Sequence, residues 1–225
     1  MWRWMYPILL TFAFGVPARA CDLALVLAVD VSGSVDETEY LIQMEGLGLA
    51  LADPVISEAL VVSEAAVTVI QWTGSARQRI TIPWTRVTDF EIADDLAARV
   101  AADPRVWRNF STAIGEALEV SMAAFEDVPD CTRKVIDVSG DGSSNEGIDP
   151  KTVHNALQSK DITVNALAIE AADKTLTRYF KDNLIVGPGA FAIRAADYRE
   201  YPSRIRLKLL REITKQTAQL TPSPQ

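Results

Sequence analysis

Apolar runs alternate with helix-like stretches along most of this chain, and no other feature constrains the fold as strongly. The run LALVLAVD (23–30) is continuously apolar, as expected of a strand that is covered on both faces. A helix-like stretch follows at 36–53, and the same order recurs with a strand at 134–140 and a helix at 149–160. This alternation predicts an α/β fold, a doubly wound and mostly parallel sheet with helices on both faces.

The remaining elements follow the same pattern. Further strands are predicted at 65–74, 77–85, 162–170 and 189–195. Further helices are predicted at 89–103, at 112–127, near 173–182 and at 201–213. Pro83 lies in the segment 77–85, and because proline cannot donate a ladder hydrogen bond, this strand is predicted to lie at an edge of the sheet.

The first twenty residues have the pattern of a signal peptide. Arg3 precedes a short apolar core at 8–16, and small residues suitable for cleavage end at Ala20. The core is too short to span a bilayer as a helix, which takes about 20 residues. We therefore expect a bacterial protein that is exported to the periplasm or secreted, begins at Cys21 and has no membrane span. The alternative is a lipoprotein acylated on Cys21, which Arg19 disfavours.

The charge of the chain excludes one class of function. Its net charge is −8, and removal of Arg3 and Arg19 with the signal peptide makes it −10. Nucleic acid binding requires the opposite balance, so no nucleic acid partner is expected. The length suits one domain at 21–213, followed by a polar tail at 214–225 that we expect to be flexible.

The two cysteines precede two of the predicted strands. Cys21 comes before the strand that ends at Asp30, and Cys131 comes before the strand that is followed by Asp141. If these strands are parallel neighbours in register, both sulfurs lie at one end of the sheet and both aspartates at the other. A disulfide between Cys21 and Cys131 is expected in an oxidising compartment, and two buried free thiols are the alternative.

Oxygen-bearing side chains follow the strand ends. Asp30, Ser32 and Ser34 end the first strand, Asp141 follows the strand 134–140, and Thr112 begins a predicted helix. Ligands of such sheets bind at the carboxyl ends of the strands. Each residue alone could be a helix cap or a turn residue. Together they are hard oxygen donors, which favours Mg²⁺, with Ca²⁺ or Mn²⁺ as alternatives, and leaves a coordination position for a partner's carboxylate.

The same residues carry a family resemblance. Asp30-x-Ser32-x-Ser34 after an apolar strand, Thr112 in TAIGEAL and Asp141 in DVSGDG resemble the metal-ion-dependent adhesion site of von Willebrand factor type A domains. The resemblance implies direct metal contacts from Ser32, Ser34 and Thr112, and direct or water-mediated contacts from Asp30 and Asp141.

The resemblance covers about residues 22–213. The WTG and PWT motifs and VIDVSGDGSSNEG resemble a bacterial exported subfamily of these domains without an assigned function. Its fold implies one antiparallel edge strand, which the segment 77–85 would supply. One position departs from the family pattern, because Gly140 stands where the family usually has Thr or Ser before the aspartate. Ser111 beside Thr112 is a second candidate ligand, but the following Ala-Ile-Gly-x-Ala-Leu favours Thr112.

Three functions remain open from the sequence. The first is a non-enzymatic, exported binding module that uses a divalent cation to bind an acidic group, an Asp or Glu carboxylate, of a protein partner. The second is a metal-dependent phosphoryl-transfer enzyme that uses Asp30, although Ser32 stands where such enzymes usually have a second aspartate. The third is a structural domain whose site holds no ion. His154 is the sole histidine and lies on a predicted helix, so a catalytic triad is not expected.

Overall fold

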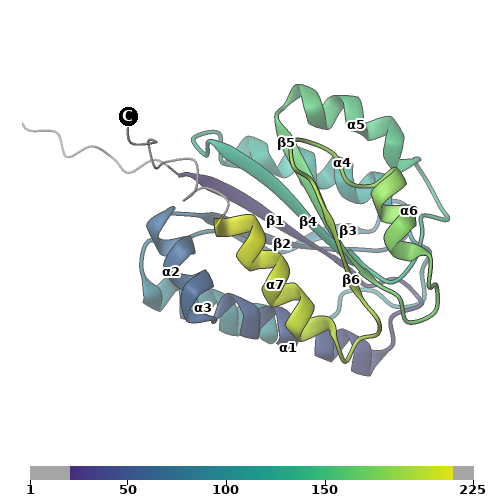
Figure 1. The fold of residues 1–225 in the computed structure, drawn as a ribbon, viewed down its shortest axis with the longest axis horizontal. Helices are drawn as coiled ribbons and strands as arrows, with labels where there is room; N and C mark the ends of the chain where they lie inside the picture. Colours follow the sequence, from purple (N-terminus) through teal and green to yellow (C-terminus); the bar gives the residue numbers. More distant parts are fainter. Residues whose placement is uncertain (1–20, 215–225) are drawn as a thin grey trace, which may run out of the picture.

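A six-stranded sheet forms the centre of the computed structural model, which describes residues 21–214 (Figure 1). The strand order is β3-β2-β1-β4-β5-β6, and all neighbouring strands are parallel except the antiparallel pair β2 and β3. The strands are β1 (Leu23–Asp30), β2 (Ala66–Trp72), β3 (Gln78–Arg86), β4 (Arg133–Gly140), β5 (Ile162–Ile169) and β6 (Ala192–Ala195). The predicted doubly wound sheet with one antiparallel edge strand is therefore confirmed, with Pro83 in the edge strand β3.

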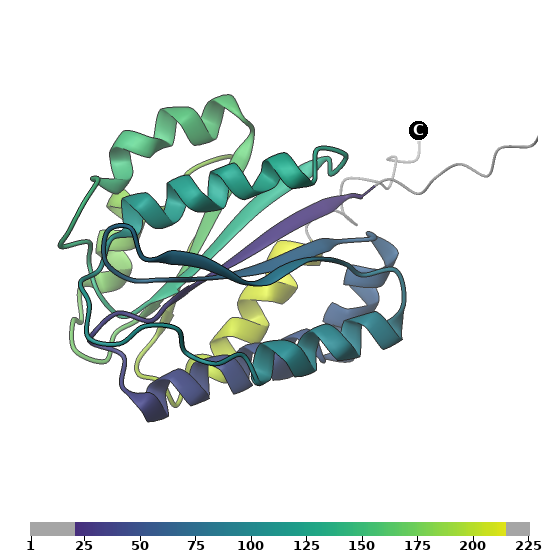
Figure 2. The same ribbon diagram turned by 180° about the vertical axis from the view of Figure 1, so that it is seen from behind.

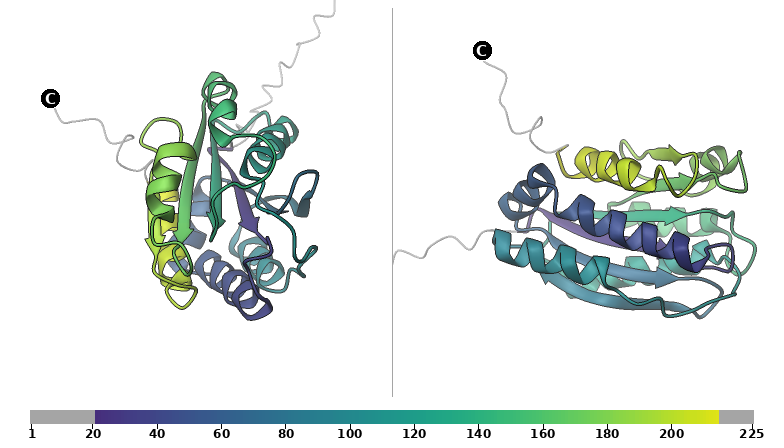
Figure 3. Two further views of the ribbon diagram at one scale, coloured as in Figure 1. Left: turned by 90° about the vertical axis from the view of Figure 1, so that its right-hand side faces the viewer. Right: turned by 90° about the horizontal axis from the view of Figure 1, so that it is seen from below.

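Helices cover both faces of the sheet. One layer contains α1 (Glu37–Leu51), α2 (Pro54–Val62), α3 (Phe90–Ala101) and α7 (Tyr201–Thr214). Figure 3 shows α1 between α3 and α7 in this layer. The other layer contains α4 (Ile114–Ala124), the 3-10 turn η1 (Phe125–Asp127), α5 (Pro150–Ser159) and α6 (Leu176–Asn183), as Figure 2 shows from behind. Within residues 21–214, no helix is both long enough and apolar enough to cross a membrane.

The strand β1 shows why the apolar run is continuous rather than alternating. Leu25 and Leu27 pack into the core on the side of α1 and α7, whereas Val26 and Ala28 pack into the core on the side of α4 and α5. Each of these side chains is at most 2% exposed. Because both faces of the strand are covered, every position along it is apolar until the chain reaches Asp30.

One helix was not predicted from the sequence. The predicted helix 36–53 ends at Leu51, and a separate helix α2 begins at Pro54. The Asp53 side chain caps α2 by accepting hydrogen bonds from the backbone N–H groups of Val55 and Ile56, at 3.0 and 3.4 Å. A capping aspartate followed by proline at the first helical position is a helix-start signal, and it separates the two helices.

Cys21 and Cys131 form a disulfide, with their Cα atoms 4.4 Å apart, as predicted. Both residues are buried and lie at the amino-terminal ends of β1 and β4, so neither a free thiol nor acylation of Cys21 fits this structure. The predicted signal peptide, 1–20, lies outside the described residues. The predicted tail, 214–225, also lies outside them, except that Thr214 is the last residue of α7.

Candidate metal centre

The strands β1 and β4 mark the point where the strand order reverses. From β1 the chain proceeds outward to β2 and β3, and from β4 it proceeds outward to β5 and β6. Asp30 is the last residue of β1, and Asp141 directly follows β4. In an open parallel sheet, ligands bind beyond the carboxyl ends of the strands at this switch point. Both aspartates therefore lie at the edge where a ligand site is expected.

Asp30 is fully buried at the start of the β1–α1 loop. Its Oδ1 accepts a hydrogen bond from the backbone N–H of Ser32 at 2.8 Å, and its backbone carbonyl accepts one from Gln43 Nε2 at 3.1 Å. Its Oδ2 is buried without a hydrogen-bond partner among the described residues. A buried carboxylate oxygen without a donor is costly unless a cation or a proton satisfies it.

Ser32 and Ser34 connect this loop with the end of β4. Their hydroxyl oxygens lie 3.2 Å apart, and the Ser34 hydroxyl donates a hydrogen bond to Asp141 Oδ1 at 2.6 Å. Ser32 and Asp141 are buried, whereas Ser34 is more exposed. The β1–α1 loop and the end of β4 are thus in direct contact, although 107 positions separate Ser34 from Asp141.

Thr112 lies in the segment before α4, which contacts both the β1–α1 loop and the loop after β4. The Phe110 carbonyl accepts a hydrogen bond from the Gly33 backbone N–H at 2.8 Å, so this segment contacts the β1–α1 loop. A Cβ placed on Gly142 would lie 3.5 Å from Thr112 Oγ1, so the threonine hydroxyl also faces the loop after β4. Thr112 is buried and Ser111 is exposed, which separates the two candidate ligands by their environment.

Gly140 has a specific steric role beside Asp30. A Cβ at this position would lie 2.9 Å from Asp30 Oδ2, closer than unbonded Cβ atoms normally approach another atom. The preceding Ser139 is buried within β4, where it pairs in register with Val29 of β1. The departure from the family pattern therefore gives the Asp30 carboxylate the space that it occupies here.

Both carboxylates are harder to ionise in the folded protein than in water. Burial, and after it the negative charge of Asp141, raises the pKa of Asp30 to about 7. Burial also raises the pKa of Asp141, while a hydrogen bond from Ser34 opposes this shift. Two adjacent, buried carboxylates with raised pKa values are a favourable environment for a divalent cation, which neutralises both charges.

The chemistry of the donors is consistent with a hard cation. Within residues 21–214, no group of three or more His, Cys, Asp or Glu side chains is placed to hold a metal ion. A cation at this edge would therefore need hydroxyl ligands as well as the two aspartates. The hydroxyls of Ser32 and Ser34 lie in the β1–α1 loop, and that of Thr112 lies in the segment before α4. Both segments contact the loop that carries Asp141, so the residues present fit such an ion.

Sequence reasoning missed Arg105 and Tyr198. One terminal nitrogen of Arg105, Nη2, donates hydrogen bonds to the carbonyls of Val31 and Ser32, each at 2.9 Å. Tyr198 precedes α7 and is buried, and the negative charge of Asp141 helps to raise its pKa. Both lie between predicted elements, so no local pattern marks them, and Arg105 reaches the site through hydrogen bonds across the fold.

Ser144 and Asn145, in the loop after β4, form hydrogen bonds with the backbone of the segment that contains Thr112. Ser144 Oγ accepts a hydrogen bond from the Ile114 backbone N–H at 3.2 Å, at the start of α4. Asn145 Oδ1 accepts one from the Thr112 backbone N–H at 2.9 Å, and its own backbone N–H donates to the Thr112 carbonyl at 2.9 Å. Both side chains therefore hold the backbone around Thr112.

The close approach of α4 to the loop after β4 gives a first prediction. A Cβ on Gly115 would lie 2.2 Å from the backbone carbonyl oxygen of Ile148, which cannot rotate away. Gly115→Ala should therefore lower the free energy of unfolding by about 1–3 kcal/mol, despite the better helix propensity of alanine. Urea denaturation followed by circular dichroism measures this change, and an unchanged or higher free energy of unfolding would contradict the packing described.

The residues that carry the resemblance to von Willebrand factor type A domains lie in three contacting segments at the switch point of the sheet. The chain belongs to the family described as "Protein of unknown function (DUF1194)", which matches residues 20–217. No curated protein matches the chain.

Several solved structures share the fold. Proximal thread matrix protein 1 from the mussel byssus, in a form with a zinc-occupied MIDAS motif, is 18% identical over 85% of this chain and 48% of its own, with a TM-score of 0.63. A von Willebrand factor type A protein from Catenulispora acidiphila is 19% identical over 85% of this chain and 43% of its own, with a TM-score of 0.58. The pilus adhesin SpaC from Lactobacillus rhamnosus GG is 13% identical over 87% and 30%, with a TM-score of 0.64. The chain spans half or less of each of these structures.

Proposed function

We propose that this protein is an exported, non-enzymatic binding module that holds a divalent cation and uses it to bind an Asp or Glu carboxylate of a protein partner. Mg²⁺ is the first candidate, and Ca²⁺ or Mn²⁺ are the alternatives. The observation that carries the proposal is the meeting of three distant segments at the ends of β1 and β4, where the buried Asp30 Oδ2 has no hydrogen-bond partner among the described residues.

The proposed ligands have distinct roles. Ser32, Ser34 and Thr112 would contact the ion directly, and Asp30 and Asp141 would neutralise its charge directly or through water. The ion, when bound, supplies a positive centre that attracts an outside carboxylate. The five residues fix the position of that centre at the edge of the sheet, where a partner can reach it.

Two observations favour binding over phosphoryl transfer. Asp30 is fully buried and its Oδ1 already accepts a hydrogen bond. A phosphoester therefore could not come close enough for Asp30 to attack it as a nucleophile. The similar structures include a byssus matrix protein and a pilus adhesin, which supports a role in adhesion. Support for export comes from the disulfide, which persists in oxidising compartments.

The raised pKa of Asp30 predicts how cation binding depends on pH. Because this pKa is raised to about 7, Asp30 carries a proton in much of the metal-free protein below pH 7, and the cation must displace it. The Mg²⁺ affinity should therefore be constant above about pH 8 and fall by up to about tenfold for each pH unit below 7. Calorimetric titrations at pH 8, 7 and 6 measure this change, and equal affinities at pH 8 and 6 would contradict it.

The proposed function is tested with two peptides that differ in one carboxylate. ¹⁵N-labelled protein is titrated with Ac-Gly-Asp-Gly-NH₂ or Ac-Gly-Asn-Gly-NH₂ in saturating Mg²⁺, and again with a chelator. We expect the Asp peptide to shift the amide signals of residues 30–34, 110–113 and 141–144 only in the presence of Mg²⁺, and the Asn peptide to shift none of them. Equal shifts by both peptides, or shifts that persist in chelator, would refute the proposal.

A further inference from the structure

A pocket of about 210 Å³ lies beside the candidate metal centre, between the start of α1 and the segment that follows α3. This segment, residues 103–109, leads across the carboxyl edge of the sheet toward α4, as Figure 2 shows. Two arginines from it, Arg105 and Arg108, line the pocket, opposite Glu37 and Tyr40 of α1. Arg105 also contacts the loop that carries Ser32 and Ser34, and Arg108 lines the same pocket.

Arg105 is held by backbone carbonyls rather than by a carboxylate. Its Nη2 donates to Val31 and Ser32, and its Nε is buried without a partner among the described residues. Arg108 lines the same pocket, so two positively charged side chains face the same space.

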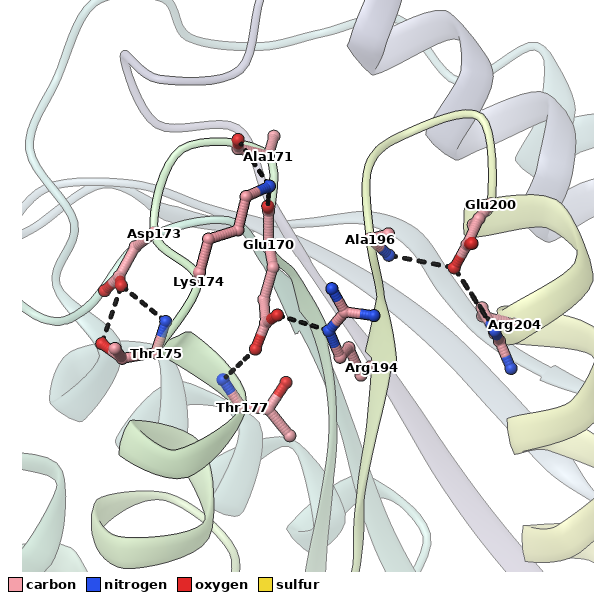
Figure 4. Close-up of polar contacts among 10 residues, drawn as sticks. All are labelled: Glu170, Ala171, Asp173, Lys174, Thr175, Thr177, Arg194, Ala196, Glu200 and Arg204. Atoms are coloured by element: carbon pink, nitrogen blue, oxygen red, sulfur yellow. Dashed lines mark hydrogen bonds and ion pairs between the residues drawn. The ribbon is translucent and has the colours of Figure 1, made fainter.

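Two other arginines near this edge of the sheet have carboxylate partners. Figure 4 shows Arg194 paired with the buried Glu170 and Arg204 paired with Glu200. For Arg105, no carboxylate of residues 21–214 lies within ion-pair distance. Arg105 thus lacks the direct carboxylate partner that Arg194 and Arg204 have.

The two acidic side chains of the pocket differ in how they are engaged. Asp103 Oδ2 accepts hydrogen bonds from Gln71 of β2 and Thr81 of β3, at 2.9 and 2.6 Å, so this carboxylate is already satisfied by the two strands. Glu37 Oε1 lies 3.5 Å from Arg108 Nη2, and the two side chains are 73% and 61% exposed. An exposed pair at this distance is weak, so an incoming carboxylate can take the place of Glu37.

We infer that Arg105 and Arg108 form an anion subsite beside the metal centre, which binds a second carboxylate of the same partner segment. The inference rests on the proposed function, since the first carboxylate is the one that the cation binds. It specifies the partner further: an acidic segment with two carboxylates close in sequence, in which one contacts the cation and the other contacts the arginine pair. Guanidinium groups suit this role because their planar donors match a carboxylate.

The experiment compares Ac-Gly-Asp-Gly-Asp-Gly-NH₂ with Ac-Gly-Asp-Gly-Asn-Gly-NH₂ in saturating Mg²⁺, by NMR titration of the 21–225 protein. We expect the peptide with two acids to bind about three- to tenfold more tightly and to shift the amide signals of residues 105–109. Arg108→Gln should remove this advantage, and Glu37→Gln, which removes the competing carboxylate, should increase it. Lys181→Gln removes an exposed positive charge from α6 and should leave the advantage unchanged.

The outcomes separate the inference from the proposed function. Equal affinity for the two peptides, or an advantage that survives in Arg108→Gln, overturns the subsite but leaves carboxylate binding at the cation intact. Failure of both peptides to bind in Mg²⁺ overturns the proposed function, and the subsite with it. Because Arg108 and Glu37 are exposed, neither variant should impair folding, and equal Mg²⁺ affinity of all four proteins serves as the check.

Discussion

Asp141→Ala should lower the affinity of the protein for Mg²⁺ by about 100-fold or more. The substitution removes one of two buried carboxylates, and it also removes the acceptor that positions the Ser34 hydroxyl, 2.6 Å from Oδ1. Removing one partner from a buried charged group costs about 3–5 kcal/mol, and 3 kcal/mol corresponds to more than 100-fold in affinity. Isothermal titration with Mg²⁺, or competition with Mn²⁺ followed by electron paramagnetic resonance, measures the loss.

A matched variant controls for the general effect of removing an acid. Asp94→Ala removes a carboxylate from the exposed face of α3, far from the carboxyl edge of β1 and β4, and should leave the Mg²⁺ affinity unchanged within about twofold. Circular dichroism of both variants shows whether they are folded. An Asp141→Ala protein that is folded and binds Mg²⁺ as tightly as the wild type would remove Asp141 from the site.

Replacement of both cysteines by serine should destabilise the protein by about 2–5 kcal/mol. The disulfide joins residues 110 positions apart, so it restricts a long loop of the unfolded chain. For a domain of this size, the melting temperature should fall by roughly 4–20 °C. Differential scanning calorimetry of Cys21→Ser/Cys131→Ser measures the change, and the reduced wild-type protein should melt at a similar temperature.

The disulfide variant should still bind Mg²⁺ below its melting temperature. Cys21 and Cys131 lie at the amino-terminal ends of β1 and β4, and the candidate ligands Asp30 and Asp141 lie at the opposite ends. The bond therefore contributes to stability without contacting the site. A melting temperature within about 2 °C of the wild type would show that the bond contributes little to stability.

The fold was predictable because local sequence patterns indicate the strands and helices directly. The apolar run of β1 is continuous since the strand is covered on both faces, and Pro83 marked β3 as the edge strand. The helix α2 was missed although Asp53 and Pro54 signal its start, because the preceding helical pattern was extended through 53. The error concerned a boundary between two helices and left the topology unchanged.

The candidate site was predictable only in part. Asp30 ends β1 and Asp141 follows β4, so the topology of the sheet was enough to group these two, whereas Thr112 precedes α4 and was grouped with them by its place at a predicted helix start and by the family resemblance. Arg105 could not be found in this way, because it reaches the Val31 carbonyl across 74 positions of sequence and lies in a segment with no regular pattern. Gly140 looked like a missing ligand in the sequence, and only its distance to Asp30 Oδ2 shows that a side chain there would crowd the carboxylate.

A crystal structure of the protein soaked with Mn²⁺ tests the central claim most directly, since anomalous scattering locates the ion without assumptions about its ligands. We predict one strong anomalous peak at the carboxyl edge of β1 and β4, within about 2.5 Å of the hydroxyl oxygens of Ser32, Ser34 and Thr112. A peak elsewhere, or Mn²⁺ bound without contact to Thr112, would contradict the account.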